Sequence, residues 1–212
     1  MSVLVIAGPT HTPLDAAREI SNRSTGRTGL LVAEALHRSG LTPRLWLGEN
    51  ITHPIPPYLP TDARFHTVHD LKKLIDHTPL DGFQAILLPA ALSDYDFLGA
   101  AGPDQRPLSQ QKWPGSLSRI DIQLRPAPRI LPLLRTLAPK AKLVGWKWEA
   151  STSLKEAEQS ARRQSEENKT EATVLNGPSY GPGYLFLPKD APGIPCSDAE
   201  ELGRVLAFFL TT

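Results

Sequence analysis

A chain of 212 residues is long enough to bury the core of one ordinary α/β domain. Its 23 basic residues nearly balance 22 acidic ones, which excludes a strong overall field for nucleic acid or an anionic membrane. The single cysteine, Cys196, excludes an internal disulfide, and the short opening apolar run does not resemble a signal peptide. We therefore expect a cytoplasmic protein, with no nucleic-acid or membrane partner, in which any anion site is local.

Apolar strands alternate with helical patterns along most of the chain. The apolar run 3–7 predicts a buried parallel strand that ends in a Gly8-Pro9-Thr10 loop, and residues 29–37 carry helical periodicity. Further strands are expected at 44–48, 64–68, 84–91, 120–124, 142–149, 172–176 and 183–187, and helices near 70–77, 130–137, 154–168 and 198–210. This alternation predicts an α/β fold with a Rossmann-like, doubly wound and mostly parallel sheet. We expect one domain over residues 1–212, with a mobile, Pro- and Gly-rich flap at about 98–119.

The segment EISNRSTGRTG, residues 19–29, has the composition of an anion site. Ser24, Gly26 and Gly29 stand where a helix is expected to begin, and there backbone N–H groups and the helix dipole favour a phosphate. The spacing matches neither the dinucleotide fingerprint nor a Walker loop. An ordinary capped helix start is the alternative interpretation.

Other candidates are weaker. His66-x-x-His69 is half of a metal motif, but the sequence offers no third ligand in a matching pattern, so two surface histidines and no metal site are expected. No activating base stands beside Cys196. Trp146 and Trp148 share one side of a strand and are either core residues or an aromatic surface for a base.

Four stretches, in order, resemble the phosphopantothenate–cysteine ligases, the C-terminal domain of the DNA/pantothenate metabolism flavoproteins. They are VLVIAGPTHTPLDAAREISNRSTGRTG, ILLPAALSDYDF, LRPAPRIL and LAPKAKLVGWKWEA, and together they extend over most of the chain. The first is similar to the family's opening strand with its G-G-T loop and its I-S-N-x-S-S-G-x-x-G segment.

The resemblance implies an enzyme of coenzyme A biosynthesis that joins 4′-phosphopantothenate to cysteine. The family uses CTP or ATP as co-substrate with Mg²⁺, passes through an acyl-nucleotidyl intermediate and acts as a homodimer. It implies Asn22 as the catalytic residue, acting on the acyl group, and Trp146 as the residue that stacks on the base, with Trp148 important for stability instead. The implied nucleotide contacts are Gly8, Ser24, Gly26, Gly29, Trp146 and Asn176, and the implied substrate contacts are Asn22, Ala90, Ala91 and Asp94.

The chain departs from the family pattern at several charged positions. Family lysines are replaced by Ser116, Gln164 and Asn168, although Arg163 and Lys169 lie one step away, and Lys112, Arg119 and Lys147 are further cations that could compensate. The Asp of the family's A-N-D segment is Gly177, and the second glycine of its G-G-T loop is Pro9. The alternatives are therefore a diverged nucleotide- or phosphate-binding protein on the same scaffold, or an NAD(P)-dependent oxidoreductase, for which the glycine fingerprint is missing.

Overall fold

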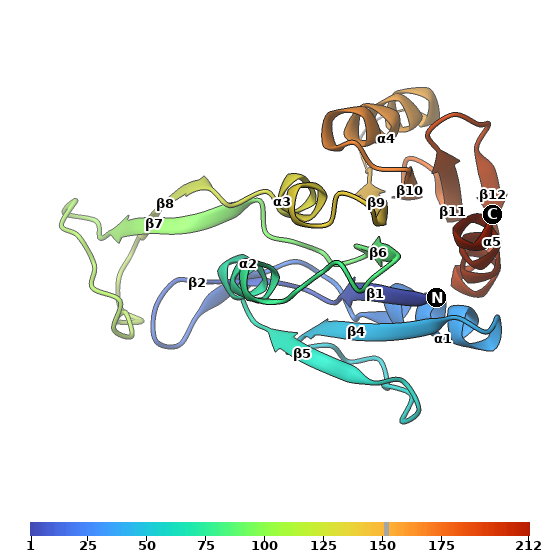
Figure 1. Ribbon diagram of the computed structural model, residues 1–212. Helices are drawn as coiled ribbons and strands as arrows, with labels where there is room; N and C mark the ends of the chain where they lie inside the picture. The colour runs from blue at the N-terminus through green and yellow to red at the C-terminus, as the bar shows by residue number, and fades with distance from the viewer. Residues whose placement is uncertain (151–152) are drawn as a thin grey trace.

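An eight-stranded sheet forms the body of the protein in a computed structural model that describes residues 1–150 and 153–212. The strand order is β12-β11-β10-β9-β6-β1-β4-β5 (Figure 1). Neighbouring strands from β10 to β5 are parallel, whereas β11 and β12 are antiparallel additions, so the predicted doubly wound and mostly parallel sheet is confirmed. The strands are β1 (Ser2–Ala7), β4 (Thr42–Gly48), β5 (Thr61–Phe65), β6 (Ala85–Leu87), β9 (Lys142–Trp148), β10 (Ala172–Gly177), β11 (Gly181–Pro188) and β12 (Ile194–Cys196).

Helices cover both faces of this sheet. One face carries α1 (Arg27–Arg38) and α5 (Ala199–Thr211), whose leucines and alanines join the inward side chains of β1, β4 and β10 in one core. The other face carries α2 (Val68–His77) and α3 (Ile130–Leu137) over a second core, while α4 (Leu154–Asn168) covers β10 and β11 through a smaller cluster. All five helices fall where hydrophobic periodicity predicts them, to within two residues at most ends.

Capping side chains explain where three of these helices begin. Thr67 and Asp70 form a capping box at α2, and Ser153 and Glu156 form another at α4. Hydrogen bonds from Ser153 hold the pKa of the Glu156 carboxyl below its usual value. Asp198 caps α5 by accepting hydrogen bonds from two backbone N–H groups.

Two of the expected strands differ from the structure by three residues or more at one end or both. Residues 64–68 were expected as a strand, but β5 ends at Phe65 because the capping box of α2 begins immediately afterwards. Of residues 84–91, only Ala85–Leu87 form β6, since Pro89 has no N–H to continue the ladder.

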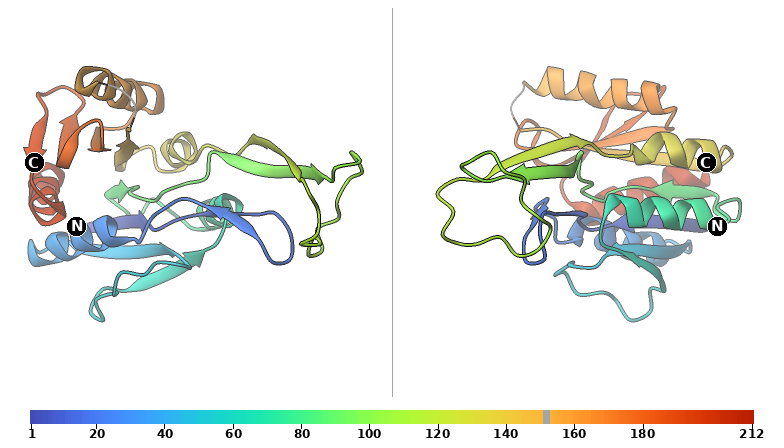
Figure 2. Two further views of the ribbon diagram at one scale, coloured as in Figure 1. Left: turned by 180° about the vertical axis from the view of Figure 1, so that it is seen from behind. Right: turned by 90° about the vertical axis from the view of Figure 1, so that its left-hand side faces the viewer.

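An arm made of two hairpins projects from the edge at which the parallel strands end (Figures 1 and 2). It consists of β2 (His11–Pro13) with β3 (Glu19–Ser21), β7 (Tyr95–Ala101) with β8 (Asp121–Pro126), and the loop 102–120. Trp113, only 3% exposed, packs with Leu14 and Ala100 in a small core of its own. The expected flap at 98–119 therefore starts inside strand β7; the strand expected at 120–124 is β8, whereas β2, β3, β7 and the pairing of both hairpins were missed. The flap's mobility stays a prediction.

Candidate functional site

Four adjacent parallel strands bring the predicted site residues to one edge of the sheet. Gly8 follows β1, Ala90 and Ala91 come after β6, and Trp146 and Asn176 lie in the last halves of β9 and β10. Because parallel strands all end on the same side, we refer to this side as the carboxyl edge. Ligands in open α/β sheets bind at such an edge, in the crevice beyond the strand ends.

The glycines of the first loops allow a close approach between two segments. Gly8 has a φ of +95° and Gly26 a φ of +77°, a left-handed conformation that favours glycine. A Cβ on Gly8 would come 2.6 Å from Ile51 Cγ2, and one on Gly26 would come 2.9 Å from the same atom. Gly29 packs against Ala7 with no room for a side chain. Both loops therefore meet at the start of α1, as a right-handed crossover predicts.

The start of α1 is suited to an anion. Its N-cap residue is Gly26, which has no side chain to satisfy the first N–H groups of the helix. Ser24 turns its hydroxyl inward and accepts a hydrogen bond of 3.4 Å from the Gly26 N–H, and Thr25 accepts one from Arg27. The N–H groups of Thr28 and Gly29 receive no cap from a described side chain, and such groups are the usual ligands of a phosphate at a helix start.

Asn22 is tied to the segment after β6. Its Nδ2 donates a 2.7 Å hydrogen bond to the Leu92 carbonyl, and the backbones of Gly8 and Ala91 are joined by a hydrogen bond of 2.9 Å. Asp94 is exposed at the base of the arm, and its carbonyl accepts a hydrogen bond from Ala127. The structure thus brings Asn22 and the Ala90–Asp94 segment together, although they are far apart in sequence.

The two tryptophans of β9 have different environments. Trp146 is partly buried against the core beneath α1 and α5, and its buried indole Nε1–H donates no hydrogen bond to any described residue. Trp148 is 63% exposed beside Asn176, so the expectation that it serves mainly stability is wrong. The period-two geometry of the strand places both indoles on one side, and only the inner one reaches the core.

Gly177, at the position of the family Asp, has a backbone conformation that favours glycine. Its φ is +109°, and a Cβ there would come 2.9 Å from the backbone nitrogen of Glu149. That nitrogen donates a 3.0 Å hydrogen bond to the carbonyl of Asn176. The close contact between the ends of β9 and β10 therefore requires glycine at this position.

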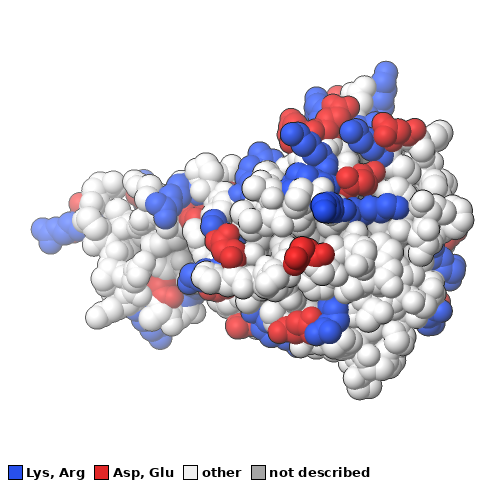
Figure 3. All heavy atoms as spheres, viewed as in Figure 1, with Lys and Arg blue, Asp and Glu red and all other residues white. Residues whose placement is uncertain are grey.

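A basic recess lies between α3, α4 and β9, and the sequence did not indicate it as a unit. It has a volume of about 440 Å³ and is lined by Arg129, Lys147, Ser160, Arg163, Gln164 and Glu167. Lys147 is ion-paired with Glu149 at 3.4 Å, whereas no described carboxylate pairs with either guanidinium. Elsewhere on the face shown in Figure 3, Lys and Arg alternate with Asp and Glu. The recess therefore has three cations against one carboxylate, and it suits an anionic ligand.

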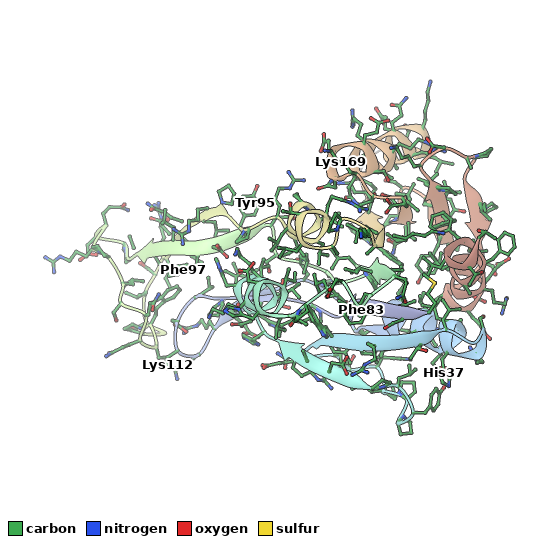
Figure 4. The ribbon with its side chains drawn as sticks, in the orientation of Figure 1. His37, Phe83, Tyr95, Phe97, Lys112 and Lys169 are labelled. Atoms are coloured by element: carbon green, nitrogen blue, oxygen red, sulfur yellow. The ribbon has the colours of Figure 1, made fainter. Side chains whose placement is uncertain are left out.

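The structure also locates the positions that lack family lysines. Gln164 Nε2 donates a 3.1 Å hydrogen bond to the Trp146 carbonyl, which links the recess to the strand that carries the tryptophan. Asn168 is 5% exposed and donates to the Gln164 carbonyl, so it acts within the helix rather than on a ligand. Lys112 lies on the arm, and Arg119 is paired with Asp121, so neither lines the recess (Figure 4).

The other residues that the sequence singled out, two histidines and the cysteine, do not form part of this site. His69 pairs with Asp96 at 2.7 Å, while His66 contacts Glu19, so the two do not act as one motif. Burial, with the nearby Glu201 and Asp198 carboxylates, raises the pKa of the Cys196 thiol to about 11, which leaves it protonated and unreactive near neutral pH. Among the described residues, no helix is both long and apolar enough to cross a membrane.

Comparison with known proteins places these features in a family. Coenzyme A biosynthesis bifunctional protein CoaBC of Thermococcus kodakarensis is 29% identical over 176 residues, which make up 82% of this chain and 40% of that protein. The chain thus spans less than half the length of this curated relative. The crystal structure of the DNA/pantothenate metabolism flavoprotein from Streptococcus pneumoniae superimposes with a TM-score of 0.87 at 21% identity, covering 100% of this chain and 98% of that one.

A mutant of Cab2, solved in complex with phosphopantothenate-cysteine, has the same fold, with a TM-score of 0.70 at 17% identity over 99% of this chain and 87% of that one. The family model described as DNA/pantothenate metabolism flavoprotein C-terminal domain matches residues 1–182. The chain belongs to this family.

Proposed function

We propose that residues 1–212 act as one cytoplasmic ligase domain that joins 4′-phosphopantothenate to cysteine with the use of a nucleoside triphosphate. Relatives named for coenzyme A biosynthesis and the Cab2 complex with phosphopantothenate-cysteine support this proposal. The observation that carries it is local: an uncapped helix start and a basic recess belong to the carboxyl half of one parallel sheet. Both proposed ligands, the nucleotide and 4′-phosphopantothenate, are phosphates with several negative charges.

The charge pattern supports an active enzyme despite the missing family lysines. Arg129 and Arg163 supply guanidiniums that pair with no carboxylate among residues 1–150 and 153–212, and Lys147 adds an ammonium from the strand. Arginine binds phosphate oxygens through two parallel hydrogen bonds, so it replaces a lysine without loss of charge. We assign these three residues to the anionic parts of the ligands.

The proposed roles at the carboxyl edge follow from position. The loops of Gly8 and of Ser24–Gly29 bind phosphates. Trp146 stacks on the base, and Asn176 contacts the nucleotide near it. Asn22, held beside Ala90 and Ala91, contacts the acyl group, where a neutral amide stabilises the developing oxygen charge without repelling a carboxylate. The carboxylate of 4′-phosphopantothenate attacks the α-phosphate and expels pyrophosphate, after which the cysteine amine displaces the nucleotide. Positioning and charge stabilisation account for most of this catalysis.

Mg²⁺ fits this site only as a companion of the nucleotide. It prefers oxygen ligands and usually retains waters while it binds substrate phosphates. Near the proposed ligands, the Glu149 carboxylate is paired with Lys147, and the described residues form no carboxylate cluster there. The phosphates themselves would therefore provide most of the ion's ligands.

A homodimer is part of the proposal, formed through the arm. The two-stranded β7–β8 ribbon exposes large apolar side chains, including Tyr95 at 55% and Leu98 at 56% (Figure 4). Ile122 and Leu124 on the paired strand are also exposed, at 41% and 42%. An apolar surface of this kind on a projecting ribbon is typical of a contact between subunits. A second subunit would then bring Asp94, at the base of the arm, near its partner's site.

One assay distinguishes the ligase from a diverged binding protein. The ligase must release pyrophosphate from CTP or ATP only when both 4′-phosphopantothenate and cysteine are present. Nucleotide binding without this dependence would instead favour a binding protein on the same scaffold. Running CTP and ATP in parallel also determines which nucleotide the enzyme uses.

A further inference from the structure

A histidine and carboxylate cluster lies where the β2–β3 hairpin meets the sheet. His11 of β2, Glu19 of β3 and His66 after β5 each offer one donor atom within 4.8 Å of the others. His11 Nδ1 is 2.6 Å from one oxygen of Glu19, and His66 Nε2 is 3.0 Å from the other. Glu49, which follows β4, faces His66 Nδ1 at 3.3 Å. Three separate parts of the chain thus converge on one point.

Ordinary hydrogen bonding leaves this cluster incompletely satisfied. His11 is 5% exposed, yet its Nδ1 accepts or donates no properly directed hydrogen bond with any described residue. This nitrogen lies 2.6 Å from a Glu19 oxygen, but the two atoms are not aligned as a hydrogen bond. Buried polar nitrogens of this kind are rare and require a specific partner.

The ring geometry argues against two protonated histidines. The imidazoles of His11 and His66 are stacked with centroids 4.6 Å apart and planes inclined by only 3°. Two imidazolium ions in that arrangement would repel each other, whereas two neutral rings bound to one cation would not. One cation bound to both neutral rings and to Glu19 would give the buried nitrogen a partner, and one ring would turn from its stacked position to bind it.

We propose that His11, Glu19 and His66 bind a divalent metal ion of the zinc class. Imidazole nitrogens with a carboxylate are ligands that Zn²⁺ and Co²⁺ prefer, whereas Mg²⁺ prefers oxygen alone. Donor atoms around a tetrahedral zinc ion lie about 3.3 Å apart, so binding would draw the three donors together and turn one of the two stacked imidazoles. Glu19 and His66 are partly exposed, at 36% and 30%, which leaves a path for the ion and a position for water.

Neighbouring side chains complete the proposed site. The Asn50 amide nitrogen lies 3.3 Å from His11 Nε2, and turning this amide by 180° would let its oxygen accept the Nε2 proton and leave the Nδ1 lone pair for the metal. Glu49 lies 3.3 Å from His66 Nδ1, close enough to accept its proton after a small change of direction. The two carboxylates also balance the charge of a divalent ion.

The position of the site indicates what the ion would do. It would cross-link the β2–β3 hairpin to the segments after β4 and β5, next to the direct hydrogen bond of 2.8 Å from the His11 N–H to the His66 carbonyl. Asn22 follows β3 by one residue, so the ion would also hold the loop that carries it. The proposal does not depend on the ligase activity, because binding is measured without substrates.

The test is metal binding by the chelator-treated full chain. Co²⁺ titration followed by visible absorption should give one tightly bound ion per chain with a tetrahedral spectrum, and Zn²⁺ should displace it while Mg²⁺ does not. Glu19→Gln, which changes an exposed carboxylate without changing its shape, should abolish this stoichiometric binding. Asn50→Ala should weaken it by about 10–100-fold, the usual effect of losing a residue that orients a ligand.

His69→Gln is the matched control, because His69 is a nearby histidine that pairs with Asp96 outside the cluster. It should bind Co²⁺ as the parent chain does. Circular dichroism of each variant checks that the fold is retained. Substoichiometric binding by the parent chain, equal binding in Glu19→Gln, or displacement by Mg²⁺ would each overturn the proposal.

Discussion

Replacing Arg163 by glutamine tests whether the basic recess binds a phosphate of the nucleotide. Two unit charges 4 Å apart interact by about 4 kcal/mol at an effective dielectric constant of 20 and by about 1 kcal/mol in water. Arg163 is exposed, so its contribution lies between these limits, at about 1.4–2.8 kcal/mol. Arg163→Gln should therefore raise the Kd for the nucleotide about ten- to a hundred-fold.

Lys155→Gln is the control for this variant. It removes the same charge from the same helix, but it lies about 12 Å further along the axis, beyond the screening length of about 8 Å at physiological salt. Titration calorimetry should show less than a twofold change in nucleotide affinity for Lys155→Gln. The affinity of the parent chain should fall with added salt more steeply than that of Arg163→Gln, since one charged contact is lost. Equal effects of the two variants would mean that the recess does not bind the nucleotide.

Four other variants test the remaining assignments. Trp146→Ala should weaken nucleotide binding by about ten- to a hundred-fold, because it loses a stacking interaction worth about 1–3 kcal/mol. Trp148→Ala changes an exposed residue and should leave the melting temperature nearly unchanged. If only Trp148→Ala weakened nucleotide binding, Trp148 would be the stacking residue. Asn22→Asp should lower kcat more than it changes nucleotide affinity, because it replaces the amide that donates to the Leu92 carbonyl with a carboxylate that repels it. A loss of nucleotide affinity with unchanged kcat would contradict the proposed role of Asn22 at the acyl group. Trp113→Ala should destabilise the packing of the arm by about 3–5 kcal/mol and shift sedimentation towards the monomer. A dimer that persists while the arm becomes sensitive to protease would show that the arm does not form the dimer contact.

The sequence predicted the body of the fold better than the arm for a physical reason. The inner strands and the helices bury apolar faces, so Val3–Ala7 and the repeat in α1 carry a strong periodic signal. The β7–β8 ribbon leaves apolar side chains exposed on a projecting hairpin, so only β8 was expected, from the alternation at 120–124, and β7 gave no clear signal. Its pairing depends on a long-range contact with Trp113, which local pattern does not reveal.

The same distinction applies to the candidate site. The first loops were predictable because glycines at a strand end and a helix start have few other uses, and Gly8, Gly26 and Gly29 all have close neighbours that require them. The basic recess was not predictable as a unit, because Arg129 and Arg163 come from a loop and a helix that meet only in the folded chain. The His11, Glu19 and His66 cluster escaped for a similar reason: the visible motif paired His66 with His69, but the fold pairs it with residues of β2 and β3.

The geometry of α4 explains how the chain can lack a family lysine at one position while the recess keeps its positive charge. Residues 160, 163, 164 and 167 all line it, and their spacing is that of one face of an α-helix. A cation at 163 therefore faces the same recess as a cation at 164, while Gln164 is left free to bond the Trp146 carbonyl. Lys147 reaches the recess from the strand beneath, so charge from two elements surrounds any anion there. A position-by-position comparison records two missing lysines, but an anion in the recess would respond to the total charge around it and to the distances of those charges.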